Sequence, residues 1–220
     1  MSGRGSPAEL ARAAAEAGVR DERLLAVMAR LPRAAFVPAE AVGRVYRDRP
    51  LRITHGQVTS QPSLIAMMVE ALALEGGEKV LEIGTGYGYQ TALLASLARE
   101  VWSVELWPDM TAAARRALDS QAIENAHLVV GDGSLGLPEQ APFDAIVVCA
   151  AFPTVPAPLI DQLAPGGRLV QPIGPGGCEE VMLFVNDPNG LAPGRGITGA
   201  SFVPLHGRHG YPLEQAPAER

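Results

Sequence analysis

Three glycines in the segment LEIGTGYGYQ lie between a buried strand pattern and a helix pattern, where a nucleotide-like ligand can bind. Gly84, Gly86 and Gly88 have no Cβ, so the chain can turn tightly and a ligand can approach backbone amides at a helix N-terminus. A dinucleotide fingerprint needs its third glycine where this sequence has Tyr89, which argues against NAD. Glu82 precedes the turn and could hold an ammonium group or its bridging waters. A plain strand-to-helix turn is the alternative.

Two acidic residues close the next two predicted strands. Glu105 ends VWSVE, where a carboxylate can accept hydrogen bonds from both hydroxyls of a ribose. Asp132 ends VVGD, where it could accept from the exocyclic amine of an adenine. Either residue alone could be a solvated strand end or a helix cap. Together with the glycine turn they predict one adenosyl pocket at the carboxyl ends of parallel strands.

A polar loop, ITHGQVTSQPSL, occupies residues 53–64 directly before an apolar helix pattern. Its polar side chains are His55, Gln57, Thr59, Ser60 and Gln61. A helix start explains Ser60 or Gln61, because proline is favoured at the first helical position and a polar residue before it can cap the free amides. Helix capping leaves the other polar residues of this loop unexplained. The second interpretation is that the polar side chains of the loop line a binding site.

The surrounding patterns predict an α/β fold, doubly wound, with a mainly parallel sheet covered on both faces. Strands are expected at 79–83, 100–105, 127–132, 144–151 and 166–174, and helices at 89–98, 108–120 and 157–163. Further strands at 179–187 and 197–205 have no long helix between them, so an antiparallel edge is expected. Residues 7–31 carry helical spacing, and a second helix starting at Ser63 is expected to end at Gly76-Gly77.

We expect a single domain over residues 1–220. Residues 1–62 would form an N-terminal helical layer with the polar loop, and residues 63–174 a cofactor-binding core. Residues 175–207 would supply the C-terminal strands and residues 208–220 a tail, in which YPLEQAPAER (211–220) is expected to be loose.

Composition excludes several classes of function. The net charge is −6 and the 18 Lys and Arg residues form no dense block, so no nucleic-acid partner is expected. The sequence has no apolar run of about 18 residues, which argues against a membrane partner or secretion. Cys149 and Cys178 form no Cys-x-x-Cys pair and the histidines do not cluster, so we expect no metal and a reducing cytoplasm. We also expect a monomer.

The segments VLEIGTGYGYQTALLA, VWSVEL, PFDAIVVCAA and LAPGGRLVQPIG resemble Rossmann-like methyltransferases that use S-adenosylmethionine, over residues 79–174. Three segments outside that core are more specific: LLAVMARLPRAAFVP, YRDRPLRITHGQVTSQP and FVPLHG. They resemble the protein-L-isoaspartate O-methyltransferase family over about residues 20–207. The resemblance implies a Rossmann-like methyltransferase fold with added N-terminal helices.

The same resemblance implies an activity. Enzymes of this family transfer a methyl group from S-adenosyl-L-methionine to the free α-carboxylate of L-isoaspartyl residues in damaged proteins and peptides, leaving S-adenosyl-L-homocysteine. The ester closes to a succinimide, which hydrolyses partly to normal aspartate. A carboxylate with an ordinary pKa near 4 is already ionised at neutral pH, so no strong general base is needed.

By position, Ser60 matches the family's active-site serine, whose hydroxyl would orient the acceptor carboxylate. The resemblance and the patterns above together assign cofactor binding to Thr59, Ser60, Glu82, Gly84, Thr85, Gly86, Gly88, Glu105, Leu106, Asp132, Gly133 and His206. They assign substrate binding to Ile53, His55, Gln57, Ser60 and Ala150.

Five residues depart from the family pattern around the acceptor rather than the adenosine. They are Arg52, Thr54, Val58, Cys149 and Ser201. They leave two alternatives open: a carboxyl methyltransferase for one dedicated peptide or another small acceptor, and a non-catalytic adenosyl-binding protein.

Overall fold

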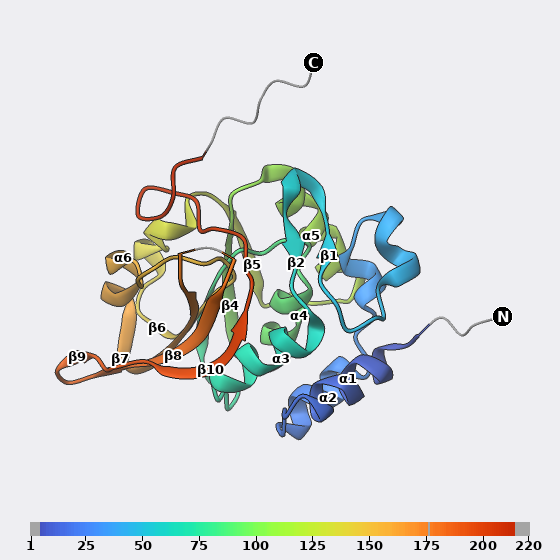
Figure 1. Cartoon of the computed structure of the whole chain (residues 1–220), viewed down its shortest axis with the longest axis horizontal. Coiled ribbons are helices and arrows are strands. Elements are labelled where there is room, and N and C mark those ends of the chain that lie inside the picture. The colour runs from blue at the N-terminus through green and yellow to red at the C-terminus, as the bar shows by residue number, and fades with distance from the viewer. Residues whose placement is uncertain (1–4, 176, 214–220) are drawn as a thin grey trace, which may run out of the picture.

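A mixed sheet forms the centre of the computed structural model, which describes residues 5–175 and 177–213 (Figure 1). In sequence order its main strands are β3 (Lys79–Ile83), β4 (Glu100–Glu105), β5 (Ala126–Val130), β6 (Phe143–Val148), β7 (Leu163–Ile173), β8 (Glu179–Asp187) and β10 (Arg195–Ala200). Their spatial order is β10-β8-β7-β6-β3-β4-β5. The strands from β3 to β7 are parallel, whereas β8 and β10 pair antiparallel. The predicted mainly parallel sheet with an antiparallel C-terminal edge is confirmed.

Consecutive residues of the inner strands point into two different apolar layers. Val80 and Val147 pack into the layer formed with α4 (Tyr89–Ala95) and α5 (Pro108–Ser120). Leu81 and Ile146 pack into the opposite layer, which contains Leu159 of α6 (Ala157–Asp161). Burial on both faces explains why these strands are mainly apolar rather than alternating in the sequence. The doubly wound arrangement is therefore confirmed.

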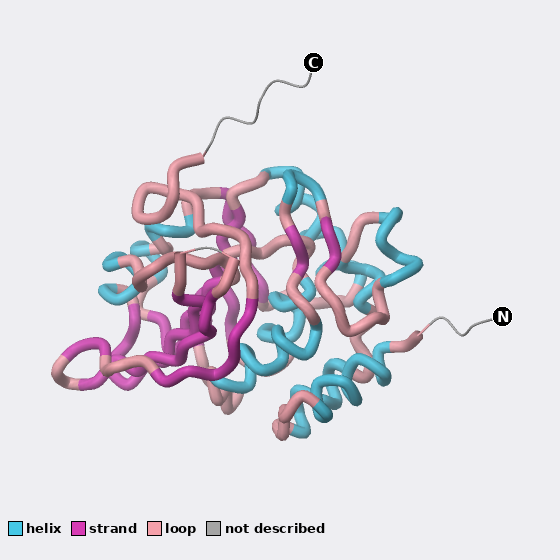
Figure 2. Tube along the Cα trace, in the orientation of Figure 1, coloured by secondary structure: helices cyan, strands magenta, loops and turns pink. Residues whose placement is uncertain are grey.

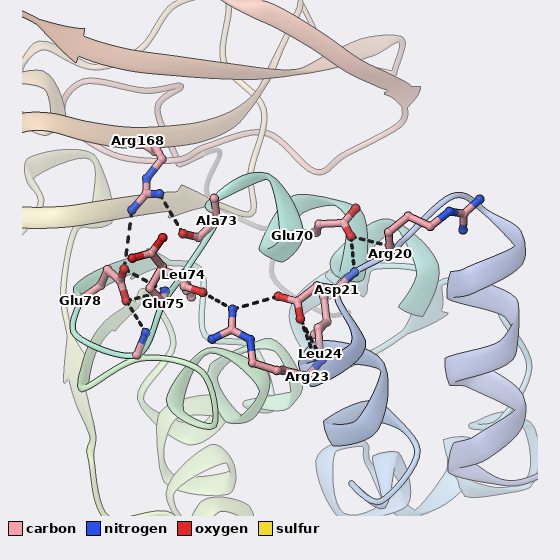
Figure 3. A network of polar contacts seen from close by, with 11 residues as sticks. Arg20, Asp21, Arg23, Leu24, Glu70, Ala73, Leu74, Glu75, Glu78 and Arg168 are labelled. Atoms are coloured by element: carbon pink, nitrogen blue, oxygen red, sulfur yellow. Dashed lines mark hydrogen bonds and ion pairs between the residues drawn. The ribbon is translucent and has the colours of Figure 1, made fainter.

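The N-terminal layer consists of α1 (Pro7–Glu16) and α2 (Glu22–Met28), which lie beside α3 (Pro62–Ala71) in Figure 1. The helical pattern of residues 7–31 divides in two because Gly18 has a φ of +112° and Asp21 caps α2. Two 3₁₀ helices follow, η1 (Arg33–Phe36) and η2 (Ala39–Arg44). A polar network ties this layer to the end of α3 (Figure 3).

The end of α3 differs from the prediction that Gly76-Gly77 would terminate it. The helix ends at Ala71, and Ala73 adopts a left-handed conformation with a φ of +46°. The turn directs Leu74 into the core, and the Glu78 carboxylate accepts hydrogen bonds from the amides of residues 75 and 76. Burial of a leucine thus outweighs the local glycine signal.

The polar loop of residues 53–64 begins as a small hairpin outside the main sheet. Strand β1 (Leu51–Arg52) pairs antiparallel with β2 (Val58–Thr59) around the short η3 (Thr54–Gly56), as Figure 2 shows. Chain reversal brings β2 and the start of α3 to the carboxyl ends of the parallel strands, where they border one cavity.

The C-terminal strand is shorter than predicted. Strand β8 carries a small extension with β9 (Gly190–Leu191), and β10 stops at Ala200. Residues 201–205 leave the sheet because the chain turns to pair with Ala151, whose carbonyl accepts from the Leu205 amide at 2.8 Å. Two 3₁₀ helices, η4 (Gly133–Leu135) and η5 (Pro138–Gln140), complete the described elements.

The predicted loose tail is partly wrong. Residues 208–213 are anchored, since the Arg208 amide donates to Asp132 and Tyr211 stacks edge-on against Phe152. Residues 214–220 lie outside the described residues. Within the described ranges, no helix combines the length and apolar character needed to cross a membrane.

Candidate active site

One cavity lies at the carboxyl ends of β3, β4 and β6, where the chain order of the sheet reverses. The strands contribute Ile83–Tyr87, Val104–Trp107 and Cys149–Ala150, and Gly133 follows β5. The hairpin segment contributes Ile53 and Gln57–Ser60, and the C-terminal segment contributes Val203–His206. A switch point of this kind is where open α/β sheets bind ligands. The predicted pocket is therefore present, with Thr85, Leu106, Gly133, Ala150 and His206 on its wall.

The three glycines of the turn have different surroundings. Gly86 has a φ of +57°, and a Cβ there would meet no atom within 4 Å, so this residue faces open space. Gly88 has a φ of +90° but does not line the cavity; a Cβ there would lie 3.2 Å from the Cβ of Ala114. The predicted ligand contact at Gly88 is therefore replaced by close packing of α4 against α5. Gly84 lines the cavity as predicted.

Glu105 connects the end of β4 to the glycine turn. Its Oε2 accepts from the Gly86 amide at 2.8 Å, and its Oε1 accepts from the Trp107 amide at 3.1 Å. Burial raises the pKa of Glu105, although these amides oppose the rise. The carboxylate lies on the cavity wall, and its remaining lone pairs can accept hydrogen bonds from a ligand.

Glu82 lies under the turn rather than on the cavity wall. It is fully buried, and its Oε2 accepts from the hydroxyls of Thr91 at 2.5 Å and Ser103 at 2.6 Å. Ser103 also contacts the Thr85 hydroxyl at 2.6 Å. The Oε1 atom of Glu82 has no hydrogen-bond partner among the described residues. Burial raises the pKa of Glu82 to about 7. A side chain so enclosed cannot contact an ammonium group directly, and contact through bridging waters, the other predicted possibility, stays a prediction.

Glu82 is expected to make folding stability depend on pH. A carboxyl whose pKa rises from 4.5 to about 7 on folding contributes stability that is fully present below pH 4.5 and is lost as the pH rises through 7. The change is on the order of 3 kcal/mol. Glu82→Gln should flatten the unfolding free energy between pH 5 and 8 in urea titrations, whereas the exposed Glu124→Gln should not. Parallel curves for Glu82→Gln and the wild type would contradict the assignment.

Ser60 does not start the helix that follows it. Helix α3 begins at Pro62, and the preceding Gln61 makes no side-chain cap. The capping carboxylate comes from Asp48, which accepts from the Ser63 amide at 2.9 Å and from the Gln61 side chain at 2.8 Å. Within the described part of the chain, the Ser60 hydroxyl makes no hydrogen bond. The helix-start interpretation of Ser60 is therefore wrong, and its hydroxyl is available to a ligand.

A second cavity adjoins the first and shares Val58, Ser60, Cys149 and Val203 with it. Its far side is formed by residues 198–202. Burial raises the pKa of the Cys149 thiol, and the amide of Gln90 contacts its sulfur at 2.8 Å. The thiol is thus protonated and unsuited to act as a nucleophile at neutral pH. Ser60 is the hydroxyl side chain common to both cavities.

His55 lies away from the cavity wall, contrary to the predicted substrate contact. Its ring stacks on Trp107 with centroids 4.0 Å apart and planes 3° apart, and its Nε2 lies 2.9 Å from both oxygens of Asp109. The hydrogen bond from His55 lowers the pKa of Asp109. These contacts fasten the tip of the hairpin to the start of α5. Ile53 and Gln57, on either side, do line the cavity.

Asp132 also lies off the cavity wall. Its Oδ1 accepts from the amide and hydroxyl of Ser134 at 2.9 and 2.6 Å, and its Oδ2 accepts from the Arg208 amide at 2.7 Å. The Ser134 and Arg208 hydrogen bonds outweigh burial, so the pKa of Asp132 is lowered. A carboxylate offers about four acceptor positions, and three are used here. Contact with an adenine stays a prediction that would use the fourth.

Arg33 and Tyr89 are site residues that the sequence patterns did not reveal. The Arg33 guanidinium donates from Nη2 to the Thr59 hydroxyl at 2.7 Å and to the Ser60 carbonyl at 3.1 Å. The Tyr89 hydroxyl is buried beside the cavity and has no hydrogen-bond partner among residues 5–175 and 177–213. A charged residue between apolar ones, in LPRAAF, was the available signal for Arg33.

A family model and the individual relatives of this chain all identify the same protein family. Residues 6–210 match the family described as Protein-L-isoaspartate(D-aspartate) O-methyltransferase (PCMT). A protein-L-isoaspartate O-methyltransferase of Anaeromyxobacter dehalogenans is 52% identical over 90% of this chain and 95% of its own. One from Methanoculleus marisnigri is 48% identical over 91% of this chain and 90% of its own.

Solved structures agree with the fold. A protein-L-isoaspartate O-methyltransferase structure matches with a TM-score of 0.82 and 30% identity, over 93% of this chain and 67% of that one. A Plasmodium falciparum structure of the PCMT type, in complex with S-adenosyl-L-homocysteine, matches in fold with a TM-score of 0.77, 21% identity, and 92% and 99% coverage. The chain belongs to the protein-L-isoaspartate (D-aspartate) O-methyltransferase family.

Proposed function

We propose that this chain transfers the methyl group of S-adenosyl-L-methionine to the free carboxylate of L-isoaspartyl residues in damaged proteins and peptides. The observation that carries the proposal is the position of Ser60, whose free hydroxyl lies where the two cavities meet. The first cavity would hold the cofactor and the second the acceptor. Family membership supports this assignment, because the relatives named above are protein-L-isoaspartate O-methyltransferases.

The residues of the first cavity fit such a cofactor. An amino-acid moiety, a ribose and a base need polar groups at separate points of a mostly apolar wall. Glu105 offers acceptor positions, and the buried Tyr89 hydroxyl is an unsatisfied polar group that a bound molecule can pair with. The open side of Gly86 lets a ligand approach the backbone. NAD is not favoured, because the position where a dinucleotide fingerprint has its third glycine holds Tyr89.

We assign the binding roles accordingly. Gly84, Thr85 and Gly86 would hold the amino-acid moiety, Glu105 and Leu106 the ribose, and Gly133 the base. Glu82 would act from beneath through its hydroxyl network, and His206 would close the cavity from the C-terminal segment. Ile53, Gln57 and Ala150 would border the reacting groups.

The chain's own task in the reaction is positioning. When bound, S-adenosylmethionine supplies a methyl group that is electrophilic because it is attached to a sulfonium. The acceptor carboxylate is ionised at neutral pH and needs no base, and the protonated Cys149 beside it does not compete as a nucleophile. The Ser60 hydroxyl would donate a hydrogen bond to one carboxylate oxygen and leave the other to attack. Holding reactants in this way can lower a barrier by roughly 7–11 kcal/mol.

A labelled-methyl assay on paired peptides tests the proposal. Two peptides of identical sequence, one with L-isoaspartate and one with L-aspartate at the same position, are compared at saturating cofactor. The expected result is methyl transfer to several unrelated isoaspartyl peptides and little transfer to their aspartyl partners. Transfer to a single peptide alone would favour the dedicated acceptor, and binding of S-adenosylmethionine without transfer to any carboxylate would favour the non-catalytic alternative.

We further propose that residues 63–174 act as the cofactor-binding core of one domain, completed by residues 1–62 and 175–207. A monomer in the cytoplasm, without nucleic-acid or membrane partners, belongs to the same proposal. It is supported by the net charge of −6 and by the free thiols of Cys149 and Cys178. Sedimentation of the purified chain would test its oligomeric state.

A further inference from the structure

Arg33 is a fully buried arginine beside the proposed reaction centre. Its side chain is 0% exposed, and among the described residues it has no carboxylate within ion-pairing distance. Its guanidinium instead donates to oxygens of the N-terminal segment and of the hairpin. Nη1 donates to the Val45 carbonyl at 2.9 Å, and Nη2 donates to the Thr59 hydroxyl at 2.7 Å and to the Ser60 carbonyl at 3.1 Å.

Burying the charged side chain of Arg33 costs free energy, because the guanidinium loses its hydration. Burial lowers the pKa of Arg33 to about 10, so the side chain remains charged at neutral pH and its desolvation must be offset by its hydrogen bonds. An apolar residue of similar volume would fill the same space without that cost. What an apolar residue cannot supply is a planar fork of donors with fixed spacing. The geometry of the bonded oxygens is therefore the feature that depends on arginine.

The hydrogen bonds of the Arg33 guanidinium connect the N-terminal segment to the hairpin segment that carries Ser60. Val45 belongs to the N-terminal segment, whereas Thr59 and Ser60 lie in the hairpin on the cavity wall. The Arg33 guanidinium also lies over the Tyr89 ring, 5.8 Å from its centroid, and Tyr89 is part of the same wall. Ser60 is held through its carbonyl, which leaves its hydroxyl free to point at a ligand.

We propose that Arg33 is a positioning residue for methyl transfer, which holds the Thr59-Ser60 backbone so that the Ser60 hydroxyl meets the acceptor carboxylate. This inference rests on the proposed function and adds a residue to it. Arg33 does not touch the reacting groups; it acts through Ser60. Its loss should therefore lower kcat at saturating cofactor and acceptor more than it changes cofactor affinity.

The competing explanation is that Arg33 only docks the N-terminal layer. The layer has a second polar attachment far from Ser60, in which Arg23 donates to the Leu74 carbonyl and Glu70 accepts from the Asp21 amide at 2.7 Å (Figure 3). Arg23→Met is thus a matched control, because it loosens the same layer at the end of α3. We expect it to lower the melting temperature while kcat stays within about twofold of wild type.

A double-mutant cycle separates the two explanations. Arg33→Met should lower kcat about tenfold, the loss expected for a misplaced hydrogen bond to a charged group. If Arg33 acts through Ser60, the double variant should be no slower than Ser60→Ala alone, so Ser60→Ala should cost only about three- to tenfold in the Arg33→Met background, against about 30- to 100-fold in the wild type. Effects that multiply fully would overturn the inference, because they would show that Arg33 acts independently of Ser60.

Two further variants keep the test decisive if Arg33→Met folds poorly. Arg33→Lys retains the charge but not the fork, so it should restore stability better than kcat. Thr59→Val removes one oxygen that Arg33 holds, and it should lower kcat about threefold at saturating cofactor, again without multiplying with Ser60→Ala. A Lys variant with wild-type kcat would overturn the inference. Failure of the proposed function would be distinct, since the wild type itself would then methylate no isoaspartyl peptide.

Discussion

Ser60→Ala is expected to lower kcat for isoaspartyl peptides by about 30- to 100-fold, with cofactor affinity within about threefold of wild type. The magnitude follows from losing one hydrogen bond to a charged acceptor, worth about 2–3 kcal/mol. The effect should fall on the transfer step because the hydroxyl makes no hydrogen bond with the described residues and caps no helix. Single-turnover transfer of labelled methyl, with cofactor binding measured separately by calorimetry, would separate the two quantities.

Two control variants make the serine result specific. Ser60→Thr keeps a hydroxyl at the same position and should recover a large part of the rate. Ser120→Ala removes a hydroxyl that bonds only the Ala117 carbonyl and the Gln121 side chain at the end of α5, and it should leave the rate unchanged. A Ser60→Ala enzyme that transfers at the wild-type rate would remove the side chain from the mechanism.

Glu105→Ala is expected to weaken binding of S-adenosylmethionine and of S-adenosylhomocysteine by about 10²-fold or more. Two hydrogen bonds from ribose hydroxyls to a carboxylate are together worth about 3 kcal/mol or more. The loss also frees the Gly86 and Trp107 amides that Glu105 now holds, so the glycine turn loses its connection to β4. Calorimetric titration of the purified variant with either compound measures the effect directly.

Glu105→Gln and Asp132→Ala refine the assignment of the cofactor cavity. The glutamine is the same size, but its NH₂ group would face one of the two donor amides, so an intermediate loss is expected. Asp132→Ala should weaken binding less than Glu105→Ala, because its carboxylate is mainly engaged by Ser134 and Arg208. A larger loss at Asp132 than at Glu105 would show that the base, rather than the ribose, dominates recognition.

The sequence predicted local elements well where one pattern controlled them. The bounds of β3, β4, α5 and β8 agree with the predicted ranges 79–83, 100–105, 108–120 and 179–187. The apolar residues of β3 are buried on both faces of the sheet, and α5 begins at a proline. The predicted end of α3 was wrong because the burial of Leu74 depends on the core beneath it, which no local sequence pattern records.

Within the site, residues next to a strand end were predicted better than residues that needed a partner. Glu105 and the turn from Gly84 to Gly86 line the cavity because parallel strands bring their carboxyl ends to one edge. His55 lies off the wall because it bonds Asp109, and Asp132 lies off the wall because it bonds Ser134 and Arg208. Their polarity is visible in the sequence, but the direction of each side chain is not.

Periodicity and short motifs within single segments are enough to predict the layered α/β architecture, the family and the kind of cofactor. Three-dimensional packing was needed to show that Asp48, rather than Ser60, caps α3, and that Arg33 holds the carbonyl of Ser60. Both contacts join the N-terminal segment to the hairpin or to the start of α3. Pairings of this kind follow from how separate elements pack in space, which spacing along the chain does not encode.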